Sequence, residues 1–339
     1  MRPVQESGRT ATGLPRPLAT VRIVACAVLV LGTAALLFLF GRRIILKMIP
    51  APPFEAYILS GSSATGTTID CGGDWFNGGK PTEIIIQSSR NGSLWDPPTD
   101  ITIRNCRIRG SIRIMGMGRN GEGRDVRRSS IREGHTARAR AAAPTRILIS
   151  GVEIEADHRI PLYLAPGVTE ITIENSKLTG WSRSVGIYLD AESGNNTIRN
   201  NSFALRCERE VIAVDGSAGN RIVGNRFEHV RNGGIYLYRN CGEGGTVRHQ
   251  TPGGNTISNN QFDPRSLGFR SYGIWLGSRN GRRIYCHQDD GYPFGSSLDN
   301  RDFADGNTVE ANIFSPATGR AIRDDGRNNH IAPGFLNTP

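Results

Sequence analysis

Short stretches in which apolar and polar residues alternate recur along most of the chain beyond residue 66. Such alternation is typical of β-strands that bury one face. One unit, an alternating strand followed by a turn and a second short strand, occurs at ITIRNCRI (101–108), ILISGVEI (147–154), ITIENSKL (171–178), TIRNNSF (197–203), RIVGNRF (221–227), TISNNQF (256–262) and TVEANIF (308–314).

The spacing of these units shows a repeat. Their central apolar residues are 46, 24, 25, 24, 35 and 52 residues apart, so the base period is 24–25, with insertions of about 22, 11 and 28 residues. A period in the twenties built of short strands is typical of a solenoid, in which each coil buries its apolar side against the next. Leucine-rich repeats have a similar period, but their L-x-x-L-x-L pattern is absent. The central residues are Ile103, Ile149, Ile173, Ile198, Ile222, Ile257 and Val309.

A third strand completes each predicted coil. It occurs at SIRIM (111–115), PLYLA (161–165), GIYLD (186–190), VIAVD (211–215), GIYLY (234–238), GIWLG (273–277) and AIRDD (321–325). An asparagine also stands two positions before the phenylalanine of four units. Asparagine tolerates the left-handed backbone of a sharp corner, and stacked amides can bond one another, so we expect a structural ladder. Its members are Asn201, Asn225, Asn260 and Asn312.

A coil of three short strands resembles that of the pectate-lyase-like superfamily of right-handed parallel β-helices, in particular its carbohydrate-binding and sugar-hydrolase repeats. The resemblance covers roughly residues 67–330. It implies an all-β solenoid that handles polysaccharide, but it does not identify a reaction, because this fold hosts many chemistries. The site motifs of alginate epimerases, pectate lyases and polygalacturonases are missing, so no catalytic residue is carried over.

An 18-residue uncharged stretch at residues 23–40 has about the minimum length for crossing a bilayer. A cleaved signal peptide is the alternative. No A-x-A-like site follows, and three basic residues come soon after, which favours an uncleaved anchor. We therefore expect an N-terminal tail (1–22), a transmembrane helix (23–40), a juxtamembrane linker (41–66), the β-helix (67–330) and a C-terminal tail (331–339).

Cysteine usage indicates an oxidising compartment. Five cysteines follow the apolar stretch and none forms a C-x-x-C motif, so disulfides in an exported domain are the simplest interpretation. We expect the β-helix on the periplasmic or extracytoplasmic side. Cys241 and Cys286 lie in neighbouring insertions and are the predicted pair, while the pairing of Cys71, Cys106 and Cys207 stays open.

The net charge of +10 is unevenly distributed. Residues 1–50 hold seven basic residues and one acidic residue, which leaves +4 for the rest of the chain. The stretch 119–143 alone holds seven arginines against three acidic residues. Nucleic-acid binding requires a basic face spread over the fold, and the sequence shows none, so no nucleic-acid partner is expected.

Three insertions leave the predicted stack at the same corner, directly after the third strand, at residues 119–143, 239–253 and 278–306. Long loops at one edge of a rigid scaffold commonly carry function. Protection of the stack is the alternative role.

Outward positions of the third strand form an aromatic column. Tyr163, Tyr188, Tyr236 and Trp275 belong to it, interrupted by Ala213. An exposed column would bind the faces of sugar rings, with Tyr188, Tyr236 and Trp275 as the substrate-binding residues. An aromatic ladder covered by loops is the alternative.

A neighbouring column places Asp190 and Asp215 on successive coils, roughly 4.8 Å apart by strand spacing. Carboxylates at that distance repel, which should raise one pKa unless a cation intervenes. The pair could serve as acid and nucleophile in glycoside cleavage or as ligands of a calcium ion. A solvated pair with splayed side chains is the alternative.

Arginines at corresponding positions of three coils are candidates for binding uronate carboxylates. They are Arg183, Arg231 and Arg270, and ion pairs with glutamates of neighbouring coils are their alternative role.

Candidate proton-transfer groups are Tyr238 and the loop histidines His135, His249 and His287. In a lyase or epimerase, one of these groups would remove the proton at C5 while arginine or a cation neutralises the uronate.

These features predict a membrane-anchored envelope protein that acts on an acidic exopolysaccharide as a lyase, epimerase or glycoside hydrolase. A non-catalytic protein of glycan binding or polysaccharide assembly is the alternative.

Overall fold

The computed structural model describes residues 55–332, apart from residues 264, 266 and 315–319. The predicted N-terminal tail and the apolar stretch 23–40 lie outside the described residues. Within the described part of the chain, no helix is both long and apolar enough to cross a membrane.

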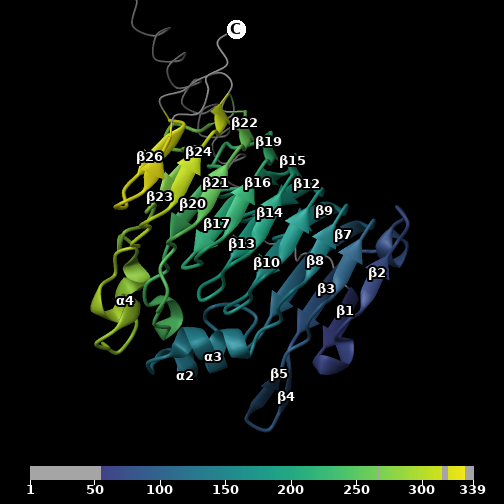
Figure 1. The fold of residues 1–339 in the computed structure, drawn as a ribbon, viewed down its shortest axis with the longest axis horizontal. Helices are drawn as coiled ribbons and strands as arrows, with labels where there is room; N and C mark the ends of the chain where they lie inside the picture. Colours follow the sequence, from purple (N-terminus) through teal and green to yellow (C-terminus); the bar gives the residue numbers. More distant parts are fainter. Residues whose placement is uncertain (1–54, 264, 266, 315–319, 333–339) are drawn as a thin grey trace, which may run out of the picture. The chain divides into compact units, whose positions relative to one another are not determined.

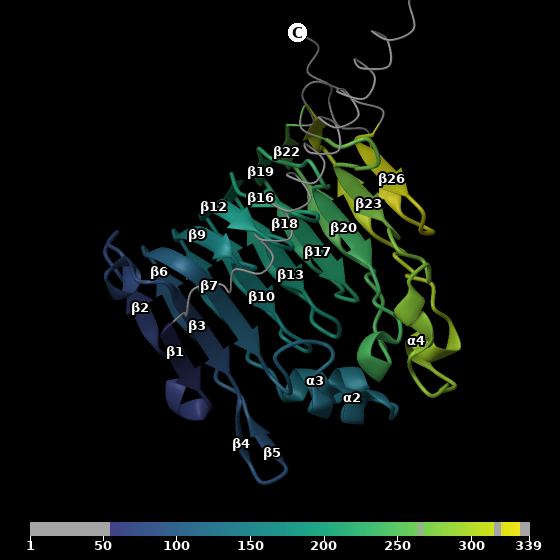
Figure 2. The same ribbon diagram turned by 180° about the vertical axis from the view of Figure 1, so that it is seen from behind.

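The described part is a stack of coils, each made of short parallel strands (Figures 1 and 2). The first strands of the coils form a nine-stranded sheet. Threonine, isoleucine and valine dominate these strands because β-branched side chains suit a pleated, half-buried surface. The strands are β2 (Thr68–Asp70), β6 (Thr102–Arg104), β8 (Leu148–Ser150), β11 (Thr172–Glu174), β14 (Thr197–Arg199), β18 (Arg221–Val223), β21 (Thr256–Ser258), β24 (Thr308–Glu310) and β27 (His330–Ile331).

The second and third strands share a 16-stranded sheet, in which the long strand β7 (Arg107–Met115) belongs to both sets. The other second strands are β9 (Glu153–His158), β12 (Lys177–Ser182), β15 (Ser202–Phe203), β16 (Arg206–Cys207), β19 (Arg226–Phe227), β22 (Gln261–Phe262) and β25 (Ile313–Phe314). The other third strands are β1 (Glu55–Ser60), β3 (Thr82–Gln87), β10 (Leu162–Leu164), β13 (Ile187–Leu189), β17 (Ile212–Asp215), β20 (Ile235–Tyr238), β23 (Ile274–Leu276) and β26 (Ile322–Asp324).

Smaller elements lie outside the stack. A hairpin pairs β4 (Ser89–Asn91) with β5 (Leu94–Asp96). The helices are α2 (Arg124–Ser130), α3 (His135–Ala141) and α4 (Gly295–Leu298), and the 3-10 turns are η1 (Ser62–Ala64), η2 (Phe76–Gly79), η3 (Glu243–Gly245) and η5 (Ile284–His287).

The predicted registers are confirmed. The central residues of the first strands pair from Ile103 through Val309 in the predicted order. In the third strands, Tyr163 pairs with Tyr188 and Tyr236 pairs with Trp275, as the column required. The N-terminal boundary differs, because part of the segment predicted as a linker forms β1, which pairs with β3.

Isoleucines and phenylalanines stacked along the solenoid form its core. Phe203, Phe227, Phe262 and Phe314 form one continuous stack, with successive ring centroids 4.7, 4.5 and 4.8 Å apart. Each coil therefore buries its apolar face only against its neighbours, as a solenoid requires.

The predicted asparagine ladder is present and buried. The Nδ2 atom of Asn201 donates to Oδ1 of Asn225 at 3.0 Å, Asn225 donates to Asn260 at 2.9 Å, and Asn260 donates to Asn312 at 3.0 Å. Each amide also donates to a carbonyl of the coil, for example that of Ile198. A second, parallel ladder that the sequence analysis missed comprises Asn196, Asn220, Asn255, Asn307 and Asn329.

The expected left-handed backbone does not lie at the ladder asparagines themselves. It lies one residue earlier in each coil, at Asn200 (φ 56°), Gly224 (φ 69°), Asn259 (φ 56°) and Ala311 (φ 52°). The corner is therefore turned by the preceding residue, and the ladder asparagine is free to aim its amide along the stack.

Two disulfides lie within the described part of the chain. The predicted bond between Cys241 and Cys286 is confirmed, and Cys71 pairs with Cys106 on the first coils. Cys207 is a free thiol, and burial raises its pKa.

The ladder predicts a large stability cost for Asn225→Ala. This change removes the acceptor of both the backbone N–H and the side-chain amide of Asn201, and the donor to the carbonyl of Ile198. Because a buried polar group without a partner costs about 1–3 kcal/mol, we expect urea denaturation to show a loss of at least about 2 kcal/mol. The matched control is Asn91→Ala, at an exposed hairpin position. Equal midpoints for the two variants would contradict the stabilising role of the ladder.

Candidate functional site

The three insertions converge at one end of the third strands, where Figure 1 shows α2, α3 and α4. The first and second insertions meet where the backbone N–H of Val247 donates to Oγ of Ser130 at 3.1 Å. The second and third meet at the Cys241–Cys286 bond and where the backbone N–H of Ser296 donates to the carbonyl of Arg248 at 2.8 Å. The predicted gathering of the insertions at one corner is therefore confirmed.

Asp190 follows β13 directly and is almost fully buried, with 1% of its surface exposed. Its Oδ2 atom accepts hydrogen bonds from the hydroxyl of Tyr163 at 2.6 Å and from the N–H of Gly121 at 2.8 Å. Its Oδ1 atom accepts the N–H of Ala191 at 2.8 Å and lies 3.8 Å from Nη1 of Arg248. The carboxylate thus joins the sheet to the first and second insertions.

Burial raises the pKa of Asp190 to about 6, although the Arg248 guanidinium opposes this shift. The charge of Asp215 on the next coil adds to the rise. A carboxyl group with a pKa near neutrality can both accept and return a proton at physiological pH.

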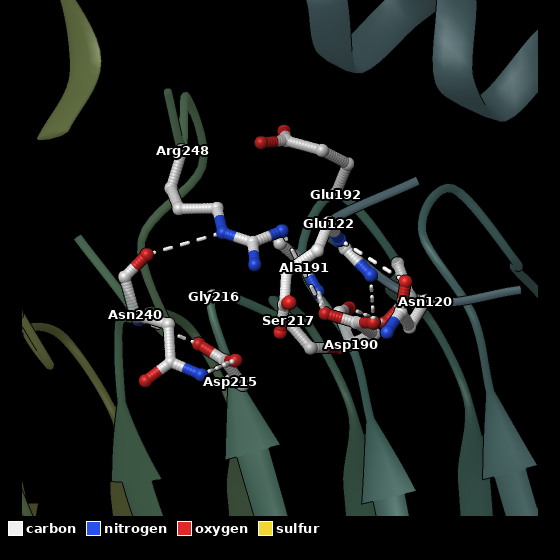
Figure 3. A network of polar contacts seen from close by, with 12 residues as sticks. Asn120, Glu122, Asp190, Ala191, Glu192, Asp215, Gly216, Ser217, Asn240 and Arg248 are labelled. Atoms are coloured by element: carbon white, nitrogen blue, oxygen red, sulfur yellow. Dashed lines mark hydrogen bonds and ion pairs between the residues drawn. The ribbon is translucent and has the colours of Figure 1, made fainter. Parts of the chain in front are cut away.

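Asp215 ends β17 and is fully buried. Its Oδ1 accepts the N–H of Asn240 at 2.7 Å, and its Oδ2 accepts Nδ2 of Asn240 at 2.7 Å and the hydroxyl of Tyr188 at 2.6 Å. The two aspartates lie at the ends of neighbouring strands, as predicted (Figure 3). The alternative of a solvated pair is wrong, because both side chains are buried and hydrogen-bonded.

A third buried carboxylate, Asp302, was not singled out from the sequence. It accepts the backbone N–H of Arg239 at 3.0 Å and that of Arg279 at 2.8 Å. Burial raises its pKa. Asp302 therefore fixes the points at which the second and third insertions leave the sheet.

A cavity of about 430 Å³ opens between the insertions, above the ends of β10 and β13. Residues 120–122 of the first insertion line it together with parts of the second and third. Asp190, Tyr163 and Tyr188 line it from the sheet. Two phenols and one carboxyl group of the sheet therefore face a space that is bounded by all three insertions.

Four arginines line this cavity: Arg209, Arg248, Arg279 and Arg283. Arg209 pairs with Glu210 at 2.7 Å, and Arg248 lies beside Asp190. Glu122, Glu243 and Asp190 are the carboxylates among the lining residues. Burial raises the pKa of Glu243 above its ordinary value.

Arg279 is the most unusual of these cations. Its side chain is buried, its guanidinium lies 3.6 Å from the ring centroid of Tyr238, and its Nη1 donates to the hydroxyl of Tyr285 at 2.7 Å. Among the residues that the structure describes, no carboxylate lies within ion-pair distance of Arg279 or Arg283. Buried charges are normally paired, so buried Arg279 is suited to hold an anion. Arg283 is exposed and lines the same cavity, where its charge adds to that of Arg279.

The aromatic column is covered. Tyr163, Tyr188 and Tyr236 are 7%, 7% and 8% exposed, and Trp275 is half-buried. The expected open platform is therefore wrong, and the alternative of a ladder under loops is correct. Tyr163 and Tyr188 stack with centroids 5.0 Å apart, while Trp275 donates through Nε1 to Asp325 at 2.9 Å. Tyr236 and Trp275 do not line the cavity.

Tyr238, a predicted base, is buried below Arg279 and does not line the cavity. Its hydroxyl donates to Glu210 at 2.9 Å, and burial raises its pKa strongly. Tyr285 lines the cavity instead, and its hydroxyl donates to Oδ1 of Asn240 at 2.8 Å. No repeat pattern points to Tyr285, because it lies in an irregular insertion outside every repeat column.

The candidate histidines do not line the cavity. Nε2 of His249 lies 2.7 Å from the carbonyl of Ser130, and its ring lies 5.3 Å from that of buried His135. His287 is exposed on η5. The loops that carry His249 and His287 are joined by the Cys241–Cys286 disulfide, which confirms their predicted proximity.

The predicted uronate-binding arginines are outside the cavity. Arg231 and Arg270 are exposed and Arg183 is half-buried, with its guanidinium 5.9 Å from the ring of Trp181. In the described part of the chain, no group of three or more histidine, cysteine or acidic residues is arranged to hold a metal ion. Asp190 and Asp215 are the predicted ligands of a calcium ion. In the structure the guanidinium of Arg248 lies 3.8 Å from Asp190 and supplies positive charge there.

Comparison with known proteins gives one family. The model of the family described as "Right handed beta helix region" matches residues 91–281, which is more than half of the chain. The predicted resemblance to right-handed parallel β-helices is thereby confirmed. None of the curated proteins matches the chain.

Two solved structures are similar at low identity. The alginate lyase from Paenibacillus sp. str. FPU-7 is 13% identical, with a TM-score of 0.34 over 84% of this chain and 91% of that chain. The A-module of the mannuronan C-5 epimerase AlgE6 from Azotobacter vinelandii is 12% identical, with a TM-score of 0.26 over 83% and 89%. Similarity at this level says nothing of the activity of this chain.

The buried His135 predicts a pH dependence of stability. Burial lowers its pKa to about 4, against 6.5 for a free histidine, so the folded state keeps it neutral while the unfolded state binds a proton. Its stabilising contribution is complete above pH 6.5 and is lost as the pH falls from about 6.5 to about 4. We expect the stability advantage of the wild type over His135→Gln to shrink across this window in urea titrations. If the free energy of unfolding of the two proteins changed with pH in the same way between pH 6.5 and 4, the lowered pKa of His135 would be contradicted.

Proposed function

The chain belongs to the right-handed β-helix family, and we propose that it binds an acidic polysaccharide between its insertions and removes the C5 proton of a uronate. Polysaccharide lyases and C5-epimerases share this step. The proposal includes export, which the two disulfides support because such bonds persist in oxidising compartments. It also includes anchoring through residues 23–40.

One observation carries the proposal, namely the pair of cavity arginines without a carboxylate partner. Arg279 is held in place from both sides, by the ring of Tyr238 and by the hydroxyl of Tyr285. A uronate carboxylate suits a guanidinium because two parallel N–H groups can donate to its two oxygens. Neutralising that carboxylate also stabilises the negative charge that develops when the C5–H bond breaks.

The proton acceptor in this proposal is the pair of Tyr163 and Asp190. As the C5–H bond breaks, the hydroxyl oxygen of Tyr163 takes the proton while its own proton passes to Oδ2 of Asp190, 2.6 Å away. Burial raises the pKa of Tyr163 well above its ordinary value, so a free phenolate is disfavoured and a coupled transfer is required. The pKa of about 6 at Asp190 leaves it ionised at neutral pH and able to accept.

Tyr285 completes the proposed reaction as the acid. Burial raises its pKa, so its hydroxyl is protonated at neutral pH. In β-elimination it would donate to the oxygen that leaves C4, while the electron pair forms the C4–C5 double bond. In epimerisation a proton would return to C5 from the opposite face.

The cavity favours this chemistry over hydrolysis by the two aspartates. Asp215 is fully buried, makes three hydrogen bonds and does not line the cavity. A glycosidase requires both carboxyl groups at the sugar. A binding protein without catalysis is the second candidate, favoured by the structural hydrogen bonds that Asp190 makes to Gly121 and Ala191.

The test is Tyr163→Phe in the full chain, incubated with polyuronates in D₂O. The wild type should give unsaturated uronate that absorbs in the ultraviolet, or deuterium at C5 detected by NMR, depending on whether the intermediate eliminates or is reprotonated. Loss of the proton acceptor should slow either signal at least about 100-fold. Retention on a polyuronate column should persist, because the arginines are intact.

Tyr236→Phe is the matched control, since it removes a buried hydroxyl from the same column but outside the cavity. It should keep the wild-type rate. If the wild type is retained on the polyuronate column but forms neither product, the non-catalytic binding protein is favoured. If Tyr163→Phe reacts as fast as the wild type, Tyr163 is excluded as the proton acceptor.

A further inference from the structure

We infer a second binding subsite for anionic sugars on the other side of the first insertion, an inference that rests on the proposed function. A separate cavity of about 250 Å³ lies between the β4–β5 hairpin and helix α2. Figures 1 and 2 show the hairpin on the same side of the stack as the helix pair α2 and α3, and an ion pair of 3.0 Å between Arg90 and Asp125 joins the hairpin to α2.

The charge of this second cavity is strongly positive. Arg90, Arg128, Arg132 and Arg138 line it, and Asp125 is the only carboxylate among its lining residues within the described chain. Arg90 and Arg128 share that one carboxylate, at 3.0 and 3.6 Å. The excess positive charge is therefore available to an anion.

Arg138 and Arg132 carry most of this excess. The guanidinium of Arg138 donates to the carbonyls of Ser129, Arg132 and Glu133, which orient it without cancelling its charge. Arg132 is exposed, and no acidic residue of the described ranges forms an ion pair with it.

Trp95 supplies the surface for a sugar ring. It lines the cavity, it is half-buried, and the guanidinium of Arg90 lies 5.2 Å from its ring centroid. Indole rings present a large, rigid apolar face with a polar edge, which suits stacking on a pyranose. An indole together with uncompensated arginines is a combination that fits an acidic sugar better than a simple anion.

The position of the subsite connects it to the first cavity. Glu122 lines the first cavity and Asp125 lines the second. These residues are three positions apart, so their Cα atoms lie within about 11 Å. A polymer bound in the first cavity can therefore extend over the first insertion to Trp95, which gives the protein a preference for long chains over short ones.

The experiment measures Kd values for the full chain in mild detergent with two probes, polygalacturonate and trigalacturonate. In the wild type the polymer should bind more tightly, because it reaches both subsites. The variant Trp95→Ala/Arg132→Gln should reduce the affinity ratio of polymer to trisaccharide by about tenfold. Two exposed neighbours that do not line the cavity, Leu94→Ala on the hairpin and Arg124→Gln on α2, should keep the wild-type ratio.

The outcomes separate this inference from the function on which it rests. Trisaccharide binding with an unchanged ratio in the double variant would overturn the second subsite and leave the proposed function standing. Failure of the wild type to bind either uronate probe would overturn both. An equal loss of affinity for polyglutamate would show a general polyanion patch and would contradict a sugar subsite.

Discussion

Three buried aspartates determine the geometry of the candidate site, two at the ends of third strands and one in the third insertion. Asp190 holds the first insertion through Gly121, Asp215 holds the second through Asn240, and Asp302 fixes the origins of the second and third at Arg239 and Arg279. Burying a carboxylate is costly unless several donors compensate it. Apart from that of Ala191, the backbone N–H groups that compensate these aspartates belong to the insertions. The same interactions that keep the carboxylates stable therefore also shape the cavity.

The solenoid supplies the rigidity that these contacts need. Two ladders of asparagine amides and a stack of phenylalanine rings fix the rise from one coil to the next. The ends of neighbouring strands are consequently held at a fixed spacing, and irregular insertions can be tied to them with little freedom. An active centre on this scaffold therefore depends on loops that have no repeat of their own, a common division between scaffold and function.

Most of the fold could be predicted from the sequence, whereas little of the site could. The strand registers follow from a period of 24–25 residues, and Cys241–Cys286 follows from insertions on adjacent coils. The burial of Tyr188 and Tyr236 beneath loops could not be predicted, because the repeat pattern contains no information on the path of an irregular insertion. For the same reason the arginines of the repeat columns, such as Arg231, were favoured over Arg279, whose burial against Tyr238 depends on the path of an insertion.

The measurement that tests the account most directly is a crystal structure of the protein with a bound uronate trisaccharide. The account predicts one sugar carboxylate within hydrogen-bonding distance of the guanidinium groups of Arg279 or Arg283, with C5 of that sugar facing the hydroxyl of Tyr163. A trisaccharide bound elsewhere, or one whose carboxylates point to solvent while its hydroxyls occupy the cavity, would contradict it.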